Sequence, residues 1–107
     1  MFRPEETICA PATAIGGAIA VIRISGSQSL NICEKIFYPS DKNIKFVDLK
    51  GFTVVLGEIR AGDEVIDEVL LTVFRAPHSY TGENSAEISC HASPFIIRNI
   101  LELLINC

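Results

Sequence analysis

Two charged side chains, Arg23 and Glu87, stand inside apolar stretches of the sequence. Arg23 interrupts the segment AIAVIRIS at residues 18–25, and Glu87 interrupts the alternating segment AEISCH at residues 86–91. A charge within an apolar strand is costly unless another group satisfies it. The pattern supports two interpretations, which remain open here: a structural ion pair or exposed edge position, and the recognition of a ligand.

The ligand interpretation predicts a flat heterocycle. A strand carboxylate such as Glu87 can accept two parallel hydrogen bonds from neighbouring N–H donors, and the guanidinium of Arg23 suits an anionic or carbonyl group. Tyr80 would add a ring face or a hydroxyl, although plain loop packing is the alternative. His91 could also contact a ligand, but a histidine at a strand end is more often satisfied by backbone. The candidate site is therefore Arg23, Glu87, Tyr80 and His91.

The loop before Glu87 is rich in polar and turn-forming residues. It begins with PHSYTGE at residues 77–83 and lies between two apolar segments. Binding residues are often carried by such loops. Gly82 can take a positive φ there, which a residue with a side chain would resist.

Other chemistries have little support in the sequence. Cys90 and His91 are adjacent, so in a strand they face opposite sides and cannot share a metal ion. Cys90 has no aligned base, and we interpret it as a small buried residue. A free-standing enzyme that uses Cys90 or His91 is the least favoured hypothesis. The sequence also has no Walker A loop.

Composition indicates one folded domain in the cytoplasm. The chain has 107 residues, 49% of them hydrophobic, and a formal net charge of −4. An acidic chain without a basic stripe is not expected to clamp nucleic acid. The start lacks the order of a signal peptide, and no apolar run approaches the length of a membrane helix. We therefore expect cytoplasmic localisation, reduced thiols and no membrane contact.

Periodicity predicts an α+β domain with a mixed β-sheet, a central hairpin and two or three helices. The hairpin turn is Gly62-Asp63, and apolar residues in both phases of its strands indicate that both faces are covered, in part by a partner subunit. Ser27 and Ser93 are expected N-caps, and Pro39 is expected to end the first helix. The polar segment 40–50 is expected to be mobile. Strands are predicted at 7–10, 18–25, 52–61, 64–74 and 86–91, and helices at 28–37 and from Pro94 onward.

Several of these segments together resemble a known family. TICAPAT at 7–13, GGAIAVIRISG at 16–26, SYTGEN at 79–84 and AEISCH at 86–91 occur in the order and at the spacing of the MnmE/TrmE family of tRNA-modification GTPases. The resemblance is to the N-terminal domain of that family. Three departures stand out: the first loop is shorter, Asn84 replaces an acidic residue, and His91-Ala92-Ser93 replaces His-Gly-Gly.

The resemblance implies a fold and a cofactor. The domain is similar to the tetrahydrofolate-binding domain of one-carbon enzymes of the glycine-cleavage T-protein type. It would bind 5-formyl-tetrahydrofolate or a related one-carbon folate and would form a homodimer. The family's folate contacts, the Arg of IRISG and the Glu before the Cys-His pair, correspond to Arg23 and Glu87. Residues 1–107 would then be a tetrahydrofolate-binding and dimerisation domain that is truncated at its C-terminal end.

The resemblance also implies what the whole protein does. Family members install a carboxymethylaminomethyl-type group on the wobble uridine of tRNA, together with an FAD-binding partner of the MnmG/GidA family. GTP, Mg²⁺ and K⁺ would be bound only by a GTPase domain that these 107 residues lack, so the chain alone is not expected to be catalytic. Transfer RNA would be a substrate of the complex and not of this domain. The alternative is a purely structural dimerisation domain without folate binding.

Overall fold

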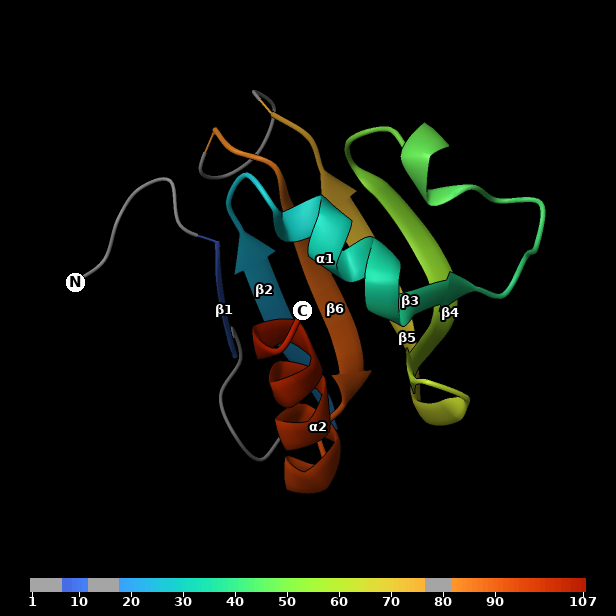
Figure 1. The fold of residues 1–107 in the computed structure, drawn as a ribbon, viewed down its shortest axis with the longest axis vertical. Helices are drawn as coiled ribbons and strands as arrows, with labels where there is room; N and C mark the ends of the chain where they lie inside the picture. Colours follow the sequence, from blue (N-terminus) through green and yellow to red (C-terminus); the bar gives the residue numbers. More distant parts are fainter. Residues whose placement is uncertain (1–6, 12–17, 77–81) are drawn as a thin grey trace.

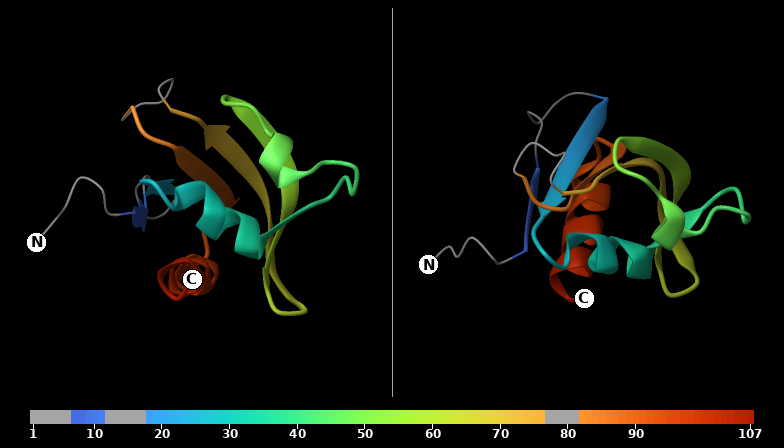
Figure 2. Two further views of the ribbon diagram at one scale, coloured as in Figure 1. Left: turned by 45° about the horizontal axis from the view of Figure 1, so that its top comes forward. Right: turned by 90° about the horizontal axis from the view of Figure 1, so that it is seen from above.

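An antiparallel sheet with helices on one face forms this protein. The computed structural model describes residues 7–11, 18–76 and 82–107. Six strands pair in the order β1-β2-β6-β5-β4-β3, and both α-helices lie on the same face of the sheet (Figures 1 and 2). The elements are β1 Ile8–Pro11, β2 Ile19–Ser25, α1 Ser29–Ile36, β3 Phe37–Pro39, a 3₁₀ helix Phe46–Asp48, β4 Thr53–Ala61, β5 Glu64–Phe74, β6 Ser85–His91 and α2 Pro94–Ile105.

The α+β class is confirmed, but the expected mixed sheet is wrong. Every strand pair is antiparallel. After β2 the chain passes through α1 to β3 at the far edge of the sheet, and β4, β5 and β6 then return strand by strand towards β2. A strand–helix–strand unit therefore does not join two neighbouring parallel strands here, although strand–helix alternation in the sequence suggested one.

Strand alternation builds the core between the sheet and the helices. In β2 and β6 the even-numbered residues face the helices, and Ile22, Ile24 and Ile88 have at most 1% exposure. Leu71 and Val73 of β5 extend this layer and are also fully buried. The helices close it with Leu30, Cys33 and Ile36 from α1 and Ile100 and Leu104 from α2.

The first helix differs from the prediction at both ends. Gln28, not Ser27, is the N-cap, and its side chain makes no capping hydrogen bond. The helix ends at Ile36, before Pro39, because the chain becomes extended at Phe37 and forms β3 against β4. The ring of Phe37 packs directly over Gly57, where an added Cβ would lie 2.5 Å from the ring. Tertiary packing therefore sets the end of this helix.

The polar segment 40–50 contributes to the core, contrary to the expectation of a mobile loop. Phe46 and Leu49 are each 9% exposed, and Phe46 meets Phe37 edge-on with ring centroids 6.5 Å apart. The side chain of Arg75 donates to the carbonyl of Leu49 and holds the segment against the sheet. The four apolar residues of this segment, Ile44, Phe46, Val47 and Leu49, stand among five charges. The burial of Phe46 and Leu49 was therefore not predicted.

The hairpin and the second helix were predicted correctly. Gly62 takes a positive φ of 61° between β4 and β5. At the start of α2 the side chain of Ser93 accepts a hydrogen bond from the N–H of Ile96 at 3.4 Å, and Pro94 occupies the first turn. Among the described residues, no helix is long and apolar enough to cross a membrane.

No helix within residues 7–11, 18–76 and 82–107 covers the other face of the sheet, and we call it the open face. Within the described part of one chain the helices therefore cover one face of the hairpin, and cover of the second face by a partner subunit stays a prediction. Four apolar side chains on this face are between 45% and 63% exposed: Ile19, Val54, Leu56 and Leu70.

Strand register arranges the open face in three rows of side chains. The Arg23 row contains Arg23, Glu87, Thr72 and Val54, and the Leu70 row contains Val21, Ser89, Leu70 and Leu56. The His91 row consists of the pairs Ile19–His91 and Glu58–Glu68, which lie next to the Leu70 row, beyond the last register pair of β5 and β6.

Candidate ligand-binding site

Arg23 and Glu87 face each other on the open face. They are register partners on β2 and β6, and both Nε and Nη2 of Arg23 donate to Oε2 of Glu87, at 2.9 and 2.6 Å. Their side chains are 46% and 20% exposed. Strand alternation turns them away from the core, so the burial cost expected from the sequence is small. A half-exposed ion pair adds at most about 1 kcal/mol to stability.

The pair leaves part of the carboxylate available to a ligand. Among the described residues, only Arg23 bonds the Glu87 carboxylate, and it uses the single oxygen Oε2. The neighbours in the row are small: Ala10 lies beside Arg23 on β1, and Thr72 lies beside Glu87 on β5. A flat ring could therefore approach Oε1 without meeting a bulky side chain in the same row.

Phe52 is a further candidate that the sequence reasoning missed. Its ring is 65% exposed and its backbone has a positive φ of 62°, which is uncommon for a bulky residue and marks local strain. The ring contacts Phe74 edge-on at 5.5 Å between centroids. Phe74 is two residues along β5 from Thr72, the neighbour of Glu87. The local sequence, Gly51-Phe52-Thr53, does not distinguish Phe52 from an ordinary first residue of a strand.

The candidate loop is anchored where the structure describes it. Gly82 has a φ of 77°, as predicted. The side-chain oxygen of Asn84 accepts from the N–H of Ala76 at 2.8 Å, and its backbone carbonyl accepts from the N–H of Gly26 at 3.1 Å. These contacts fix the start of β6 against the residues that follow β5 and the turn after β2. Tyr80, the fourth predicted site residue, lies outside the described residues.

The structure does not bring His91 to the Arg23–Glu87 pair. His91 is four residues along β6 from Glu87, a distance of about 13 Å in a strand. We expected His91 to be satisfied by backbone, but its partner is the carboxylate of Asp67. One oxygen of this carboxylate accepts from the backbone N–H of His91 at 2.9 Å, and the other lies 2.8 Å from Nδ1 of the ring. Asp67 is 8% and His91 71% exposed. The only signal for Asp67 in the sequence is its position in the buried phase of β5.

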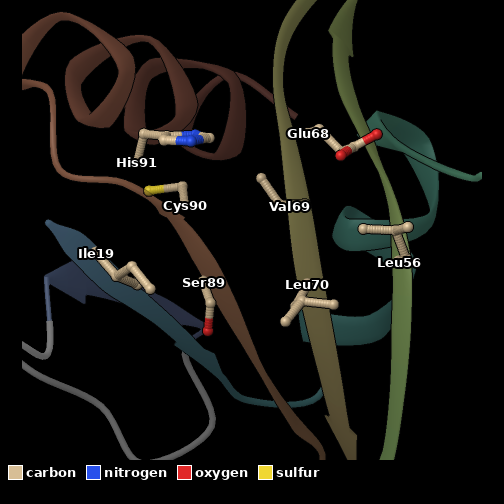
Figure 3. A pocket seen from close by; sticks show the side chains of 8 residues that line it. All are labelled: Ile19, Leu56, Glu68, Val69, Leu70, Ser89, Cys90 and His91. Atoms are coloured by element: carbon tan, nitrogen blue, oxygen red, sulfur yellow. The ribbon is translucent and has the colours of Figure 1, made fainter.

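A shallow hollow of about 170 Å³ lies beside His91 (Figure 3). Aliphatic side chains from three strands form its walls, namely Ile19, Leu56 and Leu70, and Glu68 and His91 add polar groups. The hollow lies at the end of the open face away from Phe74. It is therefore distinct from the Arg23–Glu87 pair.

The buried thiols of Cys90 and Cys33 are unsuited to nucleophilic chemistry. Cys90 is 3% exposed, and its pKa is raised first by burial and then by the charge of Asp67. Burial, with smaller contributions from Cys107 and Cys9, raises the pKa of Cys33 to about 12. The interpretation of Cys90 as a small buried residue is confirmed. Within the described ranges, no group of three or more His, Cys, Asp and Glu residues could hold a metal ion.

Fold and site together define an α+β domain. Its helices cover one face of the sheet, and the other face carries the Arg23–Glu87 ion pair. Residues 7–107 match the family model for the GTP-binding protein TrmE N-terminus, and the chain belongs to this family. The resemblance inferred from the motifs is thereby confirmed.

Relatives with a known description are much longer than this chain. The tRNA modification GTPase MnmE of Bacteroides thetaiotaomicron is 50% identical over 102 residues, which cover 95% of this chain and 22% of that protein. The tRNA modification GTPase MnmE of Porphyromonas gingivalis is also 50% identical, over 103 residues, and that of Flavobacterium psychrophilum is 48% identical over 104 residues. Each match again covers 95% of this chain and 22% of the relative. The chain thus spans less than a quarter of the length of these relatives.

Proposed function

We propose that this chain is the folate-binding and dimerising N-terminal module of a GTPase that modifies the wobble uridine of tRNA. The observation that carries the proposal is the Arg23–Glu87 pair, displayed on the open face of a domain that belongs to the TrmE N-terminus family. The proposal includes the likeness to the tetrahydrofolate-binding domain of one-carbon enzymes. The cofactor is 5-formyl-tetrahydrofolate or a related folate, which would supply the one-carbon unit.

The residues present fit a pterin-like ring. Oε1 of Glu87 would accept a ring N–H, while Arg23 keeps Oε2 engaged and so fixes the plane of the carboxylate. The positive charge of Arg23 also offsets the cost of removing water from Glu87 when the ring covers it. The exposed ring of Phe52 offers a stacking surface at the same end of the sheet. His91 stays a predicted contact, separate from this pair.

The whole protein's activity and partners belong to the same proposal. GTP hydrolysis with Mg²⁺ and K⁺ would take place in a GTPase domain outside these 107 residues, and the complex with the FAD-binding MnmG/GidA-family protein would act on tRNA in the cytoplasm. The net charge of −4 supports a domain that does not itself clamp tRNA. The apolar side chains of the open face support homodimer formation.

Isothermal titration with 5-formyl-tetrahydrofolate tests the folate proposal. Glu87→Gln keeps the shape of the side chain but removes its charge, and we expect it to weaken binding by roughly tenfold or more. Glu58→Gln is the matched control, because Glu58 is also a strand carboxylate paired with an arginine, Arg60, but lies in the His91 row. Equal affinity for both variants, with native circular dichroism, would contradict the assignment of Glu87.

A structural dimerisation domain without folate binding is the second candidate. The observation that favours it is the backbone of Ala92, which stands where the family has glycine. Its N–H is already bonded to the carbonyl of Ala18 at 3.1 Å and is not free for a ligand. A stable dimer that gives no heat with 5-formyl-tetrahydrofolate, at protein concentrations of about 100 µM, would establish this alternative.

A further inference from the structure

Two of the four thiols border one hollow on the helix side of the sheet. The hollow has a volume of about 270 Å³, and its wall is built by β1, β2, α1 and the end of α2. Cys9 of β1 and Cys107, which follows α2, both belong to this wall. The other members of the wall are one hydroxyl and four aliphatic side chains, namely Thr7, Ile24, Ile32, Leu104 and Ile105.

Accessibility separates these two thiols from the remaining two. Cys107 is exposed and Cys9 is half-buried, whereas Cys33 and Cys90 are buried. Burial raises the pKa of Cys33 to about 12, and burial followed by the charge of Asp67 raises the pKa of Cys90. The thiolate is the reactive form of cysteine. The two thiols that a reagent in solution can reach are therefore the two that share the hollow.

The surroundings of Cys33 indicate that the two accessible thiols lie close together. Cys33 is fully buried on the inner side of α1. After burial, the charges of Cys107 and Cys9 are the further causes that raise the pKa of Cys33. Because the interaction of two charges weakens with distance, Cys9 and Cys107 are both near this one residue. Three of the four sulfur atoms are thus gathered at the same end of the helix layer.

Cys9 is held in place by the strand that carries it. β1 is paired with β2, and Cys9 is the register partner of the buried Ile24. The hydroxyl of Thr7, at the rim of the hollow, accepts a hydrogen bond from the N–H of Gln28 at 3.1 Å. This bond ties the start of β1 to the start of α1. Cys9 therefore has a fixed position from which its thiol faces the hollow.

Cys107 has more freedom, because it lies beyond α2. The helical hydrogen bonding ends with Asn106, whose N–H donates to the carbonyl of Glu102 at 3.1 Å. A disulfide needs two Cα atoms within about 7 Å of each other. The backbone of Cys107 can turn into the hollow without the loss of a helical turn, and the hollow gives its side chain the space to approach Cys9.

We propose that Cys9 and Cys107 are a redox-active pair that closes to a disulfide when it meets a small-molecule disulfide. The thiolate of Cys107 attacks one sulfur of the small molecule, forms a mixed disulfide and releases one small thiolate. The thiolate of Cys9 then attacks the sulfur of Cys107, and the second small thiolate leaves. The two protein thiols lose two electrons and two protons, and the small disulfide gains them as two thiols.

The closed pair would clamp the edge of the sheet to the helix layer. β1 is the edge strand beside β2 (Figure 1), and Ala10 of β1 is the register partner of Arg23. A disulfide that closes a long loop restricts the unfolded chain and so stabilises the folded one. The hollow lies on the helix side of the sheet, so this pair leaves the open face and the Arg23–Glu87 pair accessible.

Thiol mapping after oxidation tests the pairing. The reduced 107-residue chain is incubated at high dilution with an excess of oxidised glutathione, and free thiols are then blocked in urea and mapped by mass spectrometry without reductant. We expect the Cys9–Cys107 disulfide to exceed every other pairing by roughly tenfold or more. Cys33 and Cys90 should be recovered as blocked thiols.

Oxidation of the unfolded chain in urea is the first control. Loop closure in an unfolded chain favours pairs that are close in sequence. The unfolded chain should therefore prefer Cys90–Cys107 to Cys9–Cys107, which is the most distant pair of all. Selection of the most distant pair in the native protein then reports the folded structure and not the reactivity of the thiols alone.

Two variants complete the test. In Cys9→Ser the reaction should stop at the mixed disulfide of Cys107 with glutathione. Cys90→Ala is the matched control, because Cys90 is also a strand cysteine but lies outside this hollow, and it should form the disulfide as the wild type does. Oxidation should raise the urea midpoint of the wild type and of Cys90→Ala and leave that of Cys9→Ser unchanged. Circular dichroism checks that both variants are folded.

Each result decides one part of the inference. Native wild type that keeps glutathione on Cys107 beside a free Cys9 would overturn the redox-active pair, and so would native pairings that match those of the unfolded chain. A Cys9–Cys107 disulfide that leaves the urea midpoint unchanged would overturn the clamp between β1 and α2. Folate titration is carried out on reduced protein, so its result is independent of this pair.

Discussion

If the Arg23–Glu87 pair serves ligand binding, removing it should cost the protein little stability. The test is a double-mutant cycle with Arg23→Gln, Glu87→Gln and the double variant. Glutamine has the shape of glutamate without its charge, and it keeps the aliphatic part of the arginine side chain while it removes the guanidinium. The cycle isolates the interaction free energy of the pair from the effects of each single change.

The geometry sets the expected magnitude. Two hydrogen bonds converge on one oxygen, at 2.9 and 2.6 Å, but the side chains are 46% and 20% exposed, so water screens the attraction. For a pair with this exposure we expect a coupling of about 0.5–1 kcal/mol. Each single variant should lose at most about 1–2 kcal/mol, because the remaining partner is accessible to water and is not left buried.

Urea unfolding followed by circular dichroism measures the cycle, without ligand and with 5-formyl-tetrahydrofolate. A ligand at 100 times its Kd stabilises the folded state by about 2.7 kcal/mol. We expect the wild type to show this increase and the double variant to lose it. A coupling above about 2 kcal/mol without ligand, with no ligand-dependent increase in the wild type, would refute the reasoning and make the pair structural.

Two further predictions concern the core. Gly57→Ala should lower the free energy of unfolding, measured in urea, by about 1–3 kcal/mol. The reason is that the new Cβ would lie 2.5 Å from the Phe37 ring and 2.6 Å from the Tyr38 carbonyl. An unchanged urea midpoint would contradict the packing of β3 on β4. Burial raises the pKa of Cys33 to about 12, so its thiol stays protonated below that pH. In native protein at roughly pH 8, iodoacetamide should therefore modify exposed Cys107 first and Cys33 last, and equal labelling rates by mass spectrometry would argue against this burial.

Local signals in the sequence located most of the strands and the second helix. The Gly62-Asp63 turn between β-rich segments predicted the hairpin, and Ser93-Pro94 before an apolar stripe predicted the start of α2. Both features depend on backbone preferences over a few residues, which are readable without knowledge of the fold. The end of α1 at Ile36 was not readable, because it depends on the distant contact of Phe37 with Gly57.

Arg23 and Glu87 were identified from residue type alone, since charges in apolar strands are unusual. Their pairing, and the fact that both face outward, followed only from the register of β2 and β6. Phe52 and Asp67 were missed, because the significance of Phe52 comes from its φ angle and that of Asp67 from a neighbour on another strand. Tyr80 lies outside the described residues, and its role is still a prediction.

The sequence by itself determined the α+β class, the family and the two charged residues of the site, because these depend on residue types, spacing and short-range backbone preferences. Only the tertiary structure decided the antiparallel order of the sheet and which face the helices cover. It also decided that His91 pairs with Asp67. His91 lies about 13 Å along β6 from Glu87 and is therefore separate from the Arg23–Glu87 pair. The physical reason is that these features are set by contacts between strands far apart in the chain, whose energies no local pattern encodes.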